Sequence, residues 1–528
     1  MNRGDLQQPV DVVIVGAGAA GGVFAATLAR AGKSIHILEA GPPWTRDDLV
    51  SSQIWARRLK WGGTSAVRGG DNPYSHNIIH GWGTGGAALH HYGTWPRMHP
   101  ESFHLHSTYG VGLDWPIDYD TLRPWYDRVQ REVGISGDRA QEPWRAPGEP
   151  YPMPPLIVSE QARRIGAGFK ALGKSVAPLP AIINSQPYNG RPSCLYDGWC
   201  DAGCPIGALG NPLETYLGTA LRHEGVRLDN HCTVSRVLID KRGHARGVEY
   251  FRGGQRYEQR AAVVVLAGSV VQNPRMLLNS ASTRFPAGLA NHSGLVGRYL
   301  DVEIMTAAYG LFEQPTHPYL GVNAGGLIYR EKPAPSAAGK PFGGYQWQIG
   351  PAMKPNDLFG VATTRVDLFG EDLQRFVQRG AHHIGNMVGF GGTHTRRDNR
   401  VELVATRDRD GLPLARVINT FVPASKALLD HMQREGEAVL RAAGADEVWG
   451  GPAGTGHTVG GTIMGADPAR SVTDSYGRCH DVDNLFLAGA GIMPSGGGTS
   501  PTYTIHALSL RAAEHLRENW SQYAAVAA

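Results

Sequence analysis

The sequence has little cysteine, almost no net charge and a single long apolar run. Five cysteines among 528 residues are too few for a disulfide framework. The 51 basic and 47 acidic side chains leave a formal charge of +4, which gives no reason to expect nucleic acid as a partner. We find no internal repeat and no low-complexity segment.

The apolar run at residues 12–29 is nearly long enough to span a membrane. Its glycines at positions 16, 18, 21 and 22 favour a strand, a turn and a helix instead. Residues 1–9 are polar, so no secretory signal is visible. At 528 residues the chain is too long for one simple core and predicts two domains.

The N-terminal segment predicts a dinucleotide site within a βαβ unit. Gly16 permits the tight turn, Gly18 lets the backbone approach a pyrophosphate, and Gly21 lets helix and strand pack closely. The phosphates then lie at the helix N-terminus, and Glu39 falls where an acid accepts from a ribose hydroxyl. The predicted elements are a strand at 11–15, a turn at 16–21, a helix at 22–30 and a strand at 33–38.

Three of the five cysteines, Cys194, Cys200 and Cys204, lie within eleven residues, and a proline follows the last. Tight loops of this kind, often closed by Cys-Pro, hold iron–sulfur clusters. The alternatives are three buried thiols or a zinc site, but zinc usually takes four ligands and the loop at 190–208 contains no histidine. Three thiolates favour a three-iron four-sulfur (3Fe-4S) cluster.

The remaining chain predicts a second domain inserted into the first. We assign residues 1–300 to nucleotide binding, 301–445 to a substrate-binding domain, and 446–528 to a return into the first. Residues 72–97 predict a long functional loop. Strands are predicted at 226–240, 247–251, 261–266, 307–311, 344–349, 363–368 and 484–487, and helices at 274–280, 425–443 and 501–519.

Several segments resemble the glucose–methanol–choline (GMC) oxidoreductases, FAD enzymes that oxidise alcohols. They are residues 12–39, 267–278 (AGSVVQNPRMLL), 456–465 (GHTVGGTIMG) and 484–494 (NLFLAGAGIMP). The resemblance implies an α/β fold, with a Rossmann-like FAD-binding domain and a second, sheet-containing substrate domain. It also implies that the chain is an enzyme acting on CH–OH groups.

Further segments are similar to the bacterial membrane-bound sugar dehydrogenases of this family. They are residues 107–116 (STYGVGLDWP), 151–156 (YPMPPL), 190–194 (GRPSC) and 204–208 (CPIGA). In that subgroup the cysteine loop holds a 3Fe-4S cluster, whose ligand positions match Cys194, Cys200 and Cys204. Its members work with a small subunit that carries a twin-arginine signal and with a cytochrome c. The resemblance therefore implies a periplasmic protein held at the membrane only through partners; the alternative is a lone cytoplasmic enzyme.

The same resemblance assigns the catalytic histidine to His457, because a neutral imidazole can take the hydroxyl proton. Relatives usually carry Asn or His one residue before the equivalent of Pro501, and here that residue is Ser500. A serine is shorter and is no general base at neutral pH. The predicted catalytic pair is therefore His457 and Ser500. The alternatives are that a water bridges the two, or that His506 takes part.

The flavin contacts are also implied by the resemblance. Gly85 and Gly86 match a loop that passes close to the flavin, and some relatives attach FAD covalently at the position of His90; simple packing or hydrogen bonding is the alternative for His90. The remaining cofactor-binding positions are Val234, Ala267, Gly489 and Thr502.

Together these features predict an FAD-dependent dehydrogenase of a sugar or related polyol that passes electrons through the cluster to an acceptor such as cytochrome c. The alternatives are an oxidase that uses oxygen, a dehydrogenase of a non-sugar alcohol, and a flavoprotein that only transfers electrons.

Overall fold

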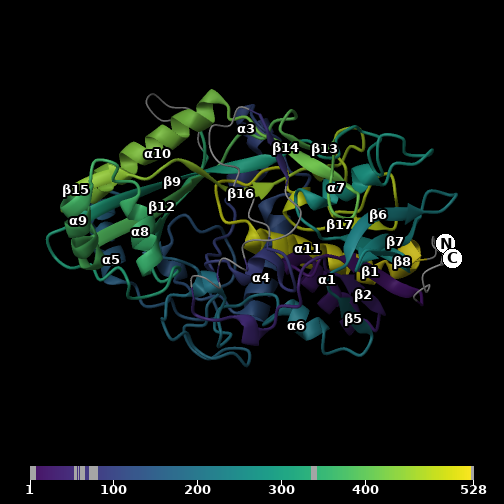
Figure 1. The fold of residues 1–528 in the computed structure, drawn as a ribbon, viewed down its shortest axis with the longest axis horizontal. Helices are drawn as coiled ribbons and strands as arrows, with labels where there is room; N and C mark the ends of the chain where they lie inside the picture. The colour runs from purple at the N-terminus through teal and green to yellow at the C-terminus, as the bar shows by residue number, and fades with distance from the viewer. Residues whose placement is uncertain are drawn as a thin grey trace.

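The computed structural model describes residues 8–52, 56, 59, 66–70, 81–333 and 342–524. Two large β-sheets lie in opposite halves of an elongated molecule, with the first strand and the last helices in the same half (Figure 1). The first sheet contains β1 (Val10–Val15), β2 (Ile35–Leu38), β5 (Val226–Asp229), β6 (Thr233–Ile239), β7 (Ala245–Arg252), β8 (Gln255–Leu266) and β17 (Leu485–Leu487).

The first sheet is ordered β5-β2-β1-β8-β7-β6, and β17 pairs with β8. Strands β5, β2, β1, β8 and β17 pair in parallel, whereas β6, β7 and β8 form an antiparallel meander. Val12, Val13 and Ile14 of β1 are completely buried, as expected for a parallel strand that is covered on both faces. Helix α1 (Ala19–Arg30) packs against α11 (Thr502–Glu518), so residues near both ends of the chain build this half.

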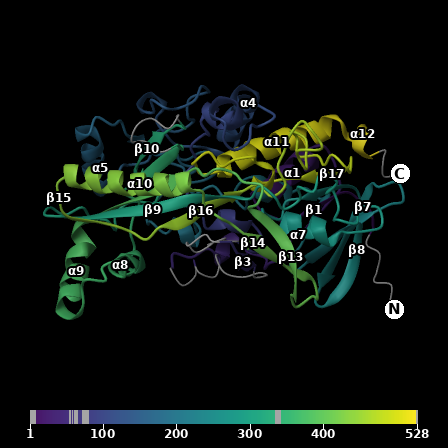
Figure 2. The ribbon, with the colours of Figure 1, turned by 90° about the horizontal axis from the view of Figure 1, so that it is seen from above.

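The second sheet is antiparallel, with α5 (Glu160–Ala171) and α10 (Pro423–Ala442) on one face and α8 (Pro355–Ala362) and α9 (Gly370–His383) against one end of the other. Its strands are β4 (Ala177–Pro178), β9 (Asp301–Phe312), β10 (Leu327–Glu331), β11 (Tyr345–Ile349), β12 (Ile384–Gly391), β15 (Ala445–Gly450) and β16 (Gly454–Val459). The order is β15-β9-β12-β11-β10-β4, with β16 also paired to β9. Helices α5 and α10 pack on it through a core that includes Ile304, Trp347 and Met432, and α10 lies along β9 in Figure 2.

The register of the second sheet gathers a different set of side chains on the opposite face. Met305 pairs with Phe390, Phe390 with Gln346, and Gln346 with Arg330. Residues directly opposite each other in adjacent strands project to the same face. Because Ile304 and Trp347 alternate with this row, it points away from α5 and α10 and belongs to the face that meets the first half.

Smaller elements complete the described chain. A third sheet, β13-β14-β3, is made of β3 (Val67–Gly69), β13 (Arg400–Arg407) and β14 (Pro413–Ile418). The other α-helices are α3 (Leu105–Tyr109), α4 (Tyr119–Val133), α6 (Tyr216–Ala220), α7 (Gln272–Asn279), α8 (Pro355–Ala362), α9 (Gly370–His383) and α12 (Trp520–Ala524).

The predicted α/β class with a second, sheet-containing domain is confirmed. One predicted strand, at residues 363–368, is wrong: turns connect α8 to α9 there, and Val366 is 92 % exposed, so its apolar character does not reflect a strand. The predicted loop at 72–97 is irregular from 81 onward apart from a 3₁₀ turn at Gly86–Leu89, while its part at 72–80 lies outside the described residues.

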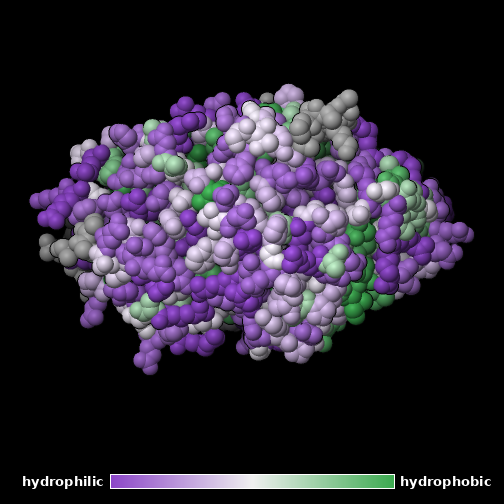
Figure 3. Space-filling view, turned by 180° about the vertical axis from the view of Figure 1, so that it is seen from behind, coloured by the Kyte–Doolittle hydropathy of each residue, from purple (hydrophilic) through white to green (hydrophobic). Residues whose placement is uncertain are grey.

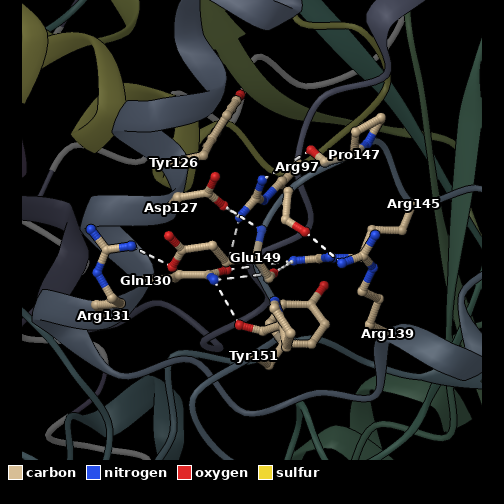
Figure 4. Close-up of polar contacts among 12 residues, drawn as sticks. Arg97, Tyr126, Asp127, Gln130, Arg131, Arg139, Arg145, Pro147, Glu149 and Tyr151 are labelled. Carbon is tan, nitrogen blue, oxygen red and sulfur yellow. Dashed lines mark hydrogen bonds and ion pairs between the residues drawn. The ribbon is translucent and has the colours of Figure 1, made fainter.

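A buried polar network fixes α4 against the segment that follows it (Figure 4). Arg97 donates to Asp127 at 2.6 Å and to Gln130 at 2.9 Å, and the amide of Gln130 donates to the carbonyl of Pro150 at 2.8 Å. Arg97 is 2 % exposed. Removing one partner of such a buried pair costs about 3–5 kcal/mol because the other charge is left uncompensated.

In the part of the chain that the structure describes, each helix is too short or too polar to cross a membrane. The face seen in Figure 3 is mostly hydrophilic, with hydrophobic residues gathered in a strip toward one end.

Candidate active site

The predicted dinucleotide turn lies between β1 and α1 and has the close contacts that require glycine. Gly16 has a φ of +104°, and a Cβ there would lie 2.6 Å from the carbonyl oxygen of Ala267. A Cβ on Gly21 would lie 2.1 Å from the carbonyl oxygen of Gly16. Gly18 caps α1 without a side chain, which leaves the helix N-terminus accessible to a phosphate.

The structure brings the second glycine pair to this turn. A Cβ on Gly86 would lie 3.1 Å from the Cα of Gly18, and Gly85 donates its N–H to the carbonyl of Ala17 at 2.9 Å. Gly489 also faces α1, since a Cβ there would lie 3.9 Å from that of Ala20. Segments that are far apart in the sequence therefore form one cradle of backbone.

Glu39 is buried and holds this cradle together. Its carboxylate accepts N–H groups from Ala17 at 2.9 Å, Gly41 at 2.9 Å and Gly83 at 3.1 Å. Burial raises the pKa of Glu39, and these N–H groups act against that rise. Both carboxylate oxygens of Glu39 already accept backbone N–H groups. That Glu39 also accepts a hydrogen bond from a ribose hydroxyl stays a prediction.

The other predicted cofactor positions surround the same region. The N–H of Cys232, two residues before Val234, donates to the carbonyl of Glu39 at 2.8 Å. Thr502 begins α11, which packs on α1. His90 ends the 3₁₀ turn that starts at Gly86. A covalent bond between His90 and the flavin remains a prediction.

His457 is held by a buried carboxylate from the second sheet. Its Nδ1 lies 2.7 Å from Oε2 of Glu303 on β9, and its side chain is 31 % exposed whereas that of Glu303 is 2 % exposed. Burial raises the pKa of Glu303, and the hydrogen bond from His457 acts against that rise. An ionised carboxylate can only accept, so beside ionised Glu303 it is Nδ1 that carries the proton and Nε2 that keeps a lone pair, as a base requires.

A second carboxylate lies two residues earlier on the same strand. Asp301 is buried and accepts from the hydroxyls of Thr393 and Thr395. Burial raises the pKa of Asp301 to about 7, and the charge of Glu303 adds to the shift. Near neutral pH Asp301 is therefore partly protonated.

Ser500 lies beside a glutamine that sequence analysis missed. The amide of Gln346 on β11 donates to the Ser500 hydroxyl at 3.4 Å, and Thr499 donates its hydroxyl to the same amide at 3.2 Å. The N–H of Thr499 donates to Oε1 of Glu303 at 2.9 Å. The carboxylate that orients His457 therefore also fixes the segment that carries Ser500.

His506 lies elsewhere in the protein. Its Nδ1 bonds the carbonyl of Thr502 at 2.8 Å, and its ring packs 4.7 Å from that of Trp95. Burial lowers the pKa of His506 to about 4. These contacts hold it as a neutral core side chain and favour Ser500 as the partner of His457.

The three cysteines of the predicted cluster loop are close enough to influence one another. Cys200 is 6 % exposed, and Cys194 and Cys204 are half-buried. Burial raises the pKa of Cys194 to about 11, with the charge of Cys204 adding to the shift. Burial also raises the pKa of Cys200, and the charges of the other two thiols contribute. Bound iron reverses such shifts, because a coordinated thiol is deprotonated.

The loop has donors as well as thiols. The N–H of Tyr196 points at the sulfur of Cys194 at 3.3 Å. The backbone of Asn323 donates a hydrogen bond to the sulfur of Cys200. Hydrogen bonds to sulfur are among the features that tune iron–sulfur clusters. Among the described residues, no group of three or more His, Cys, Asp or Glu side chains is placed to hold a metal ion. A cluster is larger than one ion, so its thiolates lie farther apart than the ligands of a single ion. A cluster at these three thiols therefore stays a prediction.

Tyr92, two residues after His90, lies close enough to the cysteine loop for charges there to act on its hydroxyl. After His90, the ring of His91 bonds the carbonyl of Gly210 at 2.9 Å. Tyr92 is 45 % exposed, yet burial raises its pKa, and the charges of Asp201 and Cys200 act on its hydroxyl.

This combination of a glycine cradle and a histidine–carboxylate pair defines an FAD-dependent oxidoreductase that acts on CH–OH groups. Residues 10–303 and 395–509 match the GMC oxidoreductase family. The chain belongs to that family, which confirms the resemblance, the FAD cofactor and the enzyme class.

Relatives of similar length include both dehydrogenases and oxidases. The chain is 30 % identical to the fructose dehydrogenase large subunit of Gluconobacter japonicus, over 97 % of this chain and 98 % of that protein. It is 30 % identical to 2-methyl-1,2-propanediol dehydrogenase of Mycolicibacterium austroafricanum, over 97 % and 96 %. Pyridoxine 4-oxidase from Mesorbium loti shares the fold, with a TM-score of 0.63, 18 % identity and coverage of 96 % and 99 %.

Proposed function

We propose that this chain is the catalytic subunit of a sugar or polyol dehydrogenase, in which Cys194, Cys200 and Cys204 hold a 3Fe-4S cluster. The observation that carries the proposal is the set of three thiols in one loop, where Cys200 is buried and the N–H of Tyr196 points at the sulfur of Cys194 at 3.3 Å. The similarity to a fructose dehydrogenase and to a diol dehydrogenase over nearly the whole chain supports the substrate class.

The side chains of this site have separate tasks. Nε2 of His457 takes the proton of the substrate hydroxyl, and the carboxylate of Glu303 stabilises the imidazolium that forms. Ser500 lies on the segment fixed by Thr499 and contributes a hydrogen bond to the substrate oxygen. FAD, when bound in the glycine cradle, supplies the acceptor for the hydride that leaves the carbon.

The cluster would supply one-electron transfer. A reduced flavin holds two electrons whereas a cytochrome accepts one, so a one-electron relay near the surface removes the mismatch. Of the three thiols, Cys194 and Cys204 are partly exposed, which suits delivery to a partner.

Exposed apolar side chains surround this loop and support docking of a protein acceptor. Leu195 is 72 % exposed and Ile157 is 68 % exposed, and the N–H of Ile157 donates to the Tyr196 hydroxyl at 3.0 Å. Leu320, exposed by 56 %, precedes Gly321, whose carbonyl oxygen would lie 2.9 Å from a Cβ on Gly198. We call Leu195, Ile157 and Leu320 the cysteine-loop patch. As partners we propose a cytochrome c and a small subunit with a twin-arginine signal, and as location the periplasmic side of a membrane.

Replacing Leu195 by glutamate should slow electron transfer to cytochrome c by roughly tenfold or more, because a charge in a docking centre costs more than about 1.4 kcal/mol. Reduction of a small dye should not change. Steady-state rates with both acceptors measure the ratio. The matched control is Val366→Glu, an equally drastic change at a residue 92 % exposed and outside the patch. Equal slowing by both variants would contradict docking at this patch.

The proposed function is tested by the visible spectrum of anaerobic protein mixed with sugars, sugar acids, diols and simple alcohols. Bleaching of the flavin by a sugar or polyol is expected, followed by reoxidation with cytochrome c or dyes. Bleaching only by a non-sugar alcohol would change the substrate class. Rapid reoxidation by oxygen with peroxide formed, and protein free of iron, would support an oxidase instead.

A further inference from the structure

Gln346 occupies a central place on the sheet face that meets the flavin half. It is completely buried, and its neighbours across the sheet are Phe390 and Arg330. The ring of Phe390 lies 5.1 Å from that of His457. The sheet therefore positions Gln346 beside the catalytic pair, although it lies more than a hundred residues from either member in sequence.

The hydrogen bonds of Gln346 have one direction. Its Oε1 accepts from the Thr499 hydroxyl at 3.2 Å, so Nε2 faces Ser500 and donates to its Oγ at 3.4 Å. An amide nitrogen can only donate, whereas a hydroxyl has one hydrogen and two lone pairs. Ser500 therefore accepts from Gln346 and keeps its own hydrogen for another acceptor.

The arrangement is tied to the base through Glu303. That carboxylate accepts from Nδ1 of His457 at 2.7 Å and from the N–H of Thr499 at 2.9 Å. Glu303 thus fixes both the tautomer of His457 and the position of Thr499. The hydroxyl of Thr499 in turn fixes the orientation of the Gln346 amide. The acceptor and the donor that meet the substrate oxygen are aligned by the same buried carboxylate.

We propose that Gln346 is a positioning residue that orients the Ser500 hydroxyl as a hydrogen-bond donor to the substrate oxygen, so that the two residues together replace the Asn or His expected at position 500. The proposal rests on the oxidation of a CH–OH group. In that reaction the C–H bond breaks with its electron pair going to FAD, the O–H proton goes to His457, and a C=O bond forms. Ser500 transfers no proton; it stabilises the negative charge that develops on the oxygen.

A double-mutant cycle tests this role. Gln346→Met removes the amide at similar length and should slow flavin reduction by about 10-fold or more, with kcat and kcat/KM falling together because the lost interaction belongs to the transition state. In a Ser500→Asn background the same change should cost less than about 3-fold, because an asparagine amide carries its own donor and the two sites are coupled only through Ser500. Rates are measured by anaerobic stopped flow with whichever alcohol bleaches the flavin.

The matched control is Gln348→Met, on the same strand and the same face two residues away; it should leave the rate unchanged. FAD content and melting temperature are compared for all variants. If Gln346→Met does not retain FAD, Gln346→Glu, which is isosteric but accepts instead of donating, takes its place and should slow the reaction further. Equal slowing in both Ser500 backgrounds, or no slowing, overturns the proposal. A protein bleached only by non-sugar alcohols would overturn the substrate class and still allow this test.

Discussion

Replacing His457 by glutamine should slow anaerobic flavin reduction by ~10²–10⁴-fold, the usual contribution of a general base. Glutamine can hydrogen-bond Glu303 but cannot take a proton from the substrate hydroxyl. FAD should remain bound, because the glycine cradle at Gly16–Gly21 is built from other elements. Stopped-flow spectra at saturating substrate measure the rate.

The companion variant is Glu303→Gln. It keeps the shape of the side chain but removes the charge that stabilises the imidazolium and fixes the proton on Nδ1 of His457. We expect a smaller loss than for His457→Gln, together with a changed pH dependence of the reduction rate. An unchanged rate in His457→Gln would exclude this histidine as the base.

Replacing Cys200 by serine should abolish the cluster and leave FAD in place. Wild-type protein purified without oxygen should contain roughly three irons and four sulfides for each FAD, as expected for a thiolate-held 3Fe-4S cluster. In the variant, iron and the electron paramagnetic resonance signal of the cluster should be lost, and reduction of cytochrome c with them. Reduction of the flavin by substrate should persist.

The control for this variant is Cys232→Ser. Cys232 is also buried, but it lies outside the loop, and its thiol bonds the carbonyl of Asn230 at 3.4 Å, a contact that a hydroxyl can keep. Iron should be retained. Wild-type protein with FAD and no iron would refute the cluster.

The nucleotide half could be predicted from sequence because its signals are local. The strand, the glycines at 16, 18 and 21, and the acid at 39 lie within one continuous segment, so spacing alone is informative. The cysteine loop is equally local. The strand predicted at 363–368 failed because apolar residues in an exposed connection resemble a short strand.

The positions of Glu303 and Gln346 could not be predicted, because their role comes from pairing between distant strands. A weak signal was present, since Asp301 and Glu303 are acidic residues at alternate positions of an otherwise apolar strand. Alternation indicates a shared face, but not that the face meets a histidine more than 150 residues later. Only the register of β9, β11 and β12 brings these side chains to Ser500.

The pairing of β17 with β8 and the packing of α11 on α1 make the flavin half depend on segments that are synthesised hundreds of residues apart. The C-terminal part of β8 has β1 on one side and β17 on the other, so a nascent chain that ends before Leu485 has an open strand edge at Val264–Leu266. Such an edge can pair with other chains. The flavin half is complete only when α11, which ends at Glu518, can pack on α1, so shorter nascent chains lack one wall of the nucleotide half.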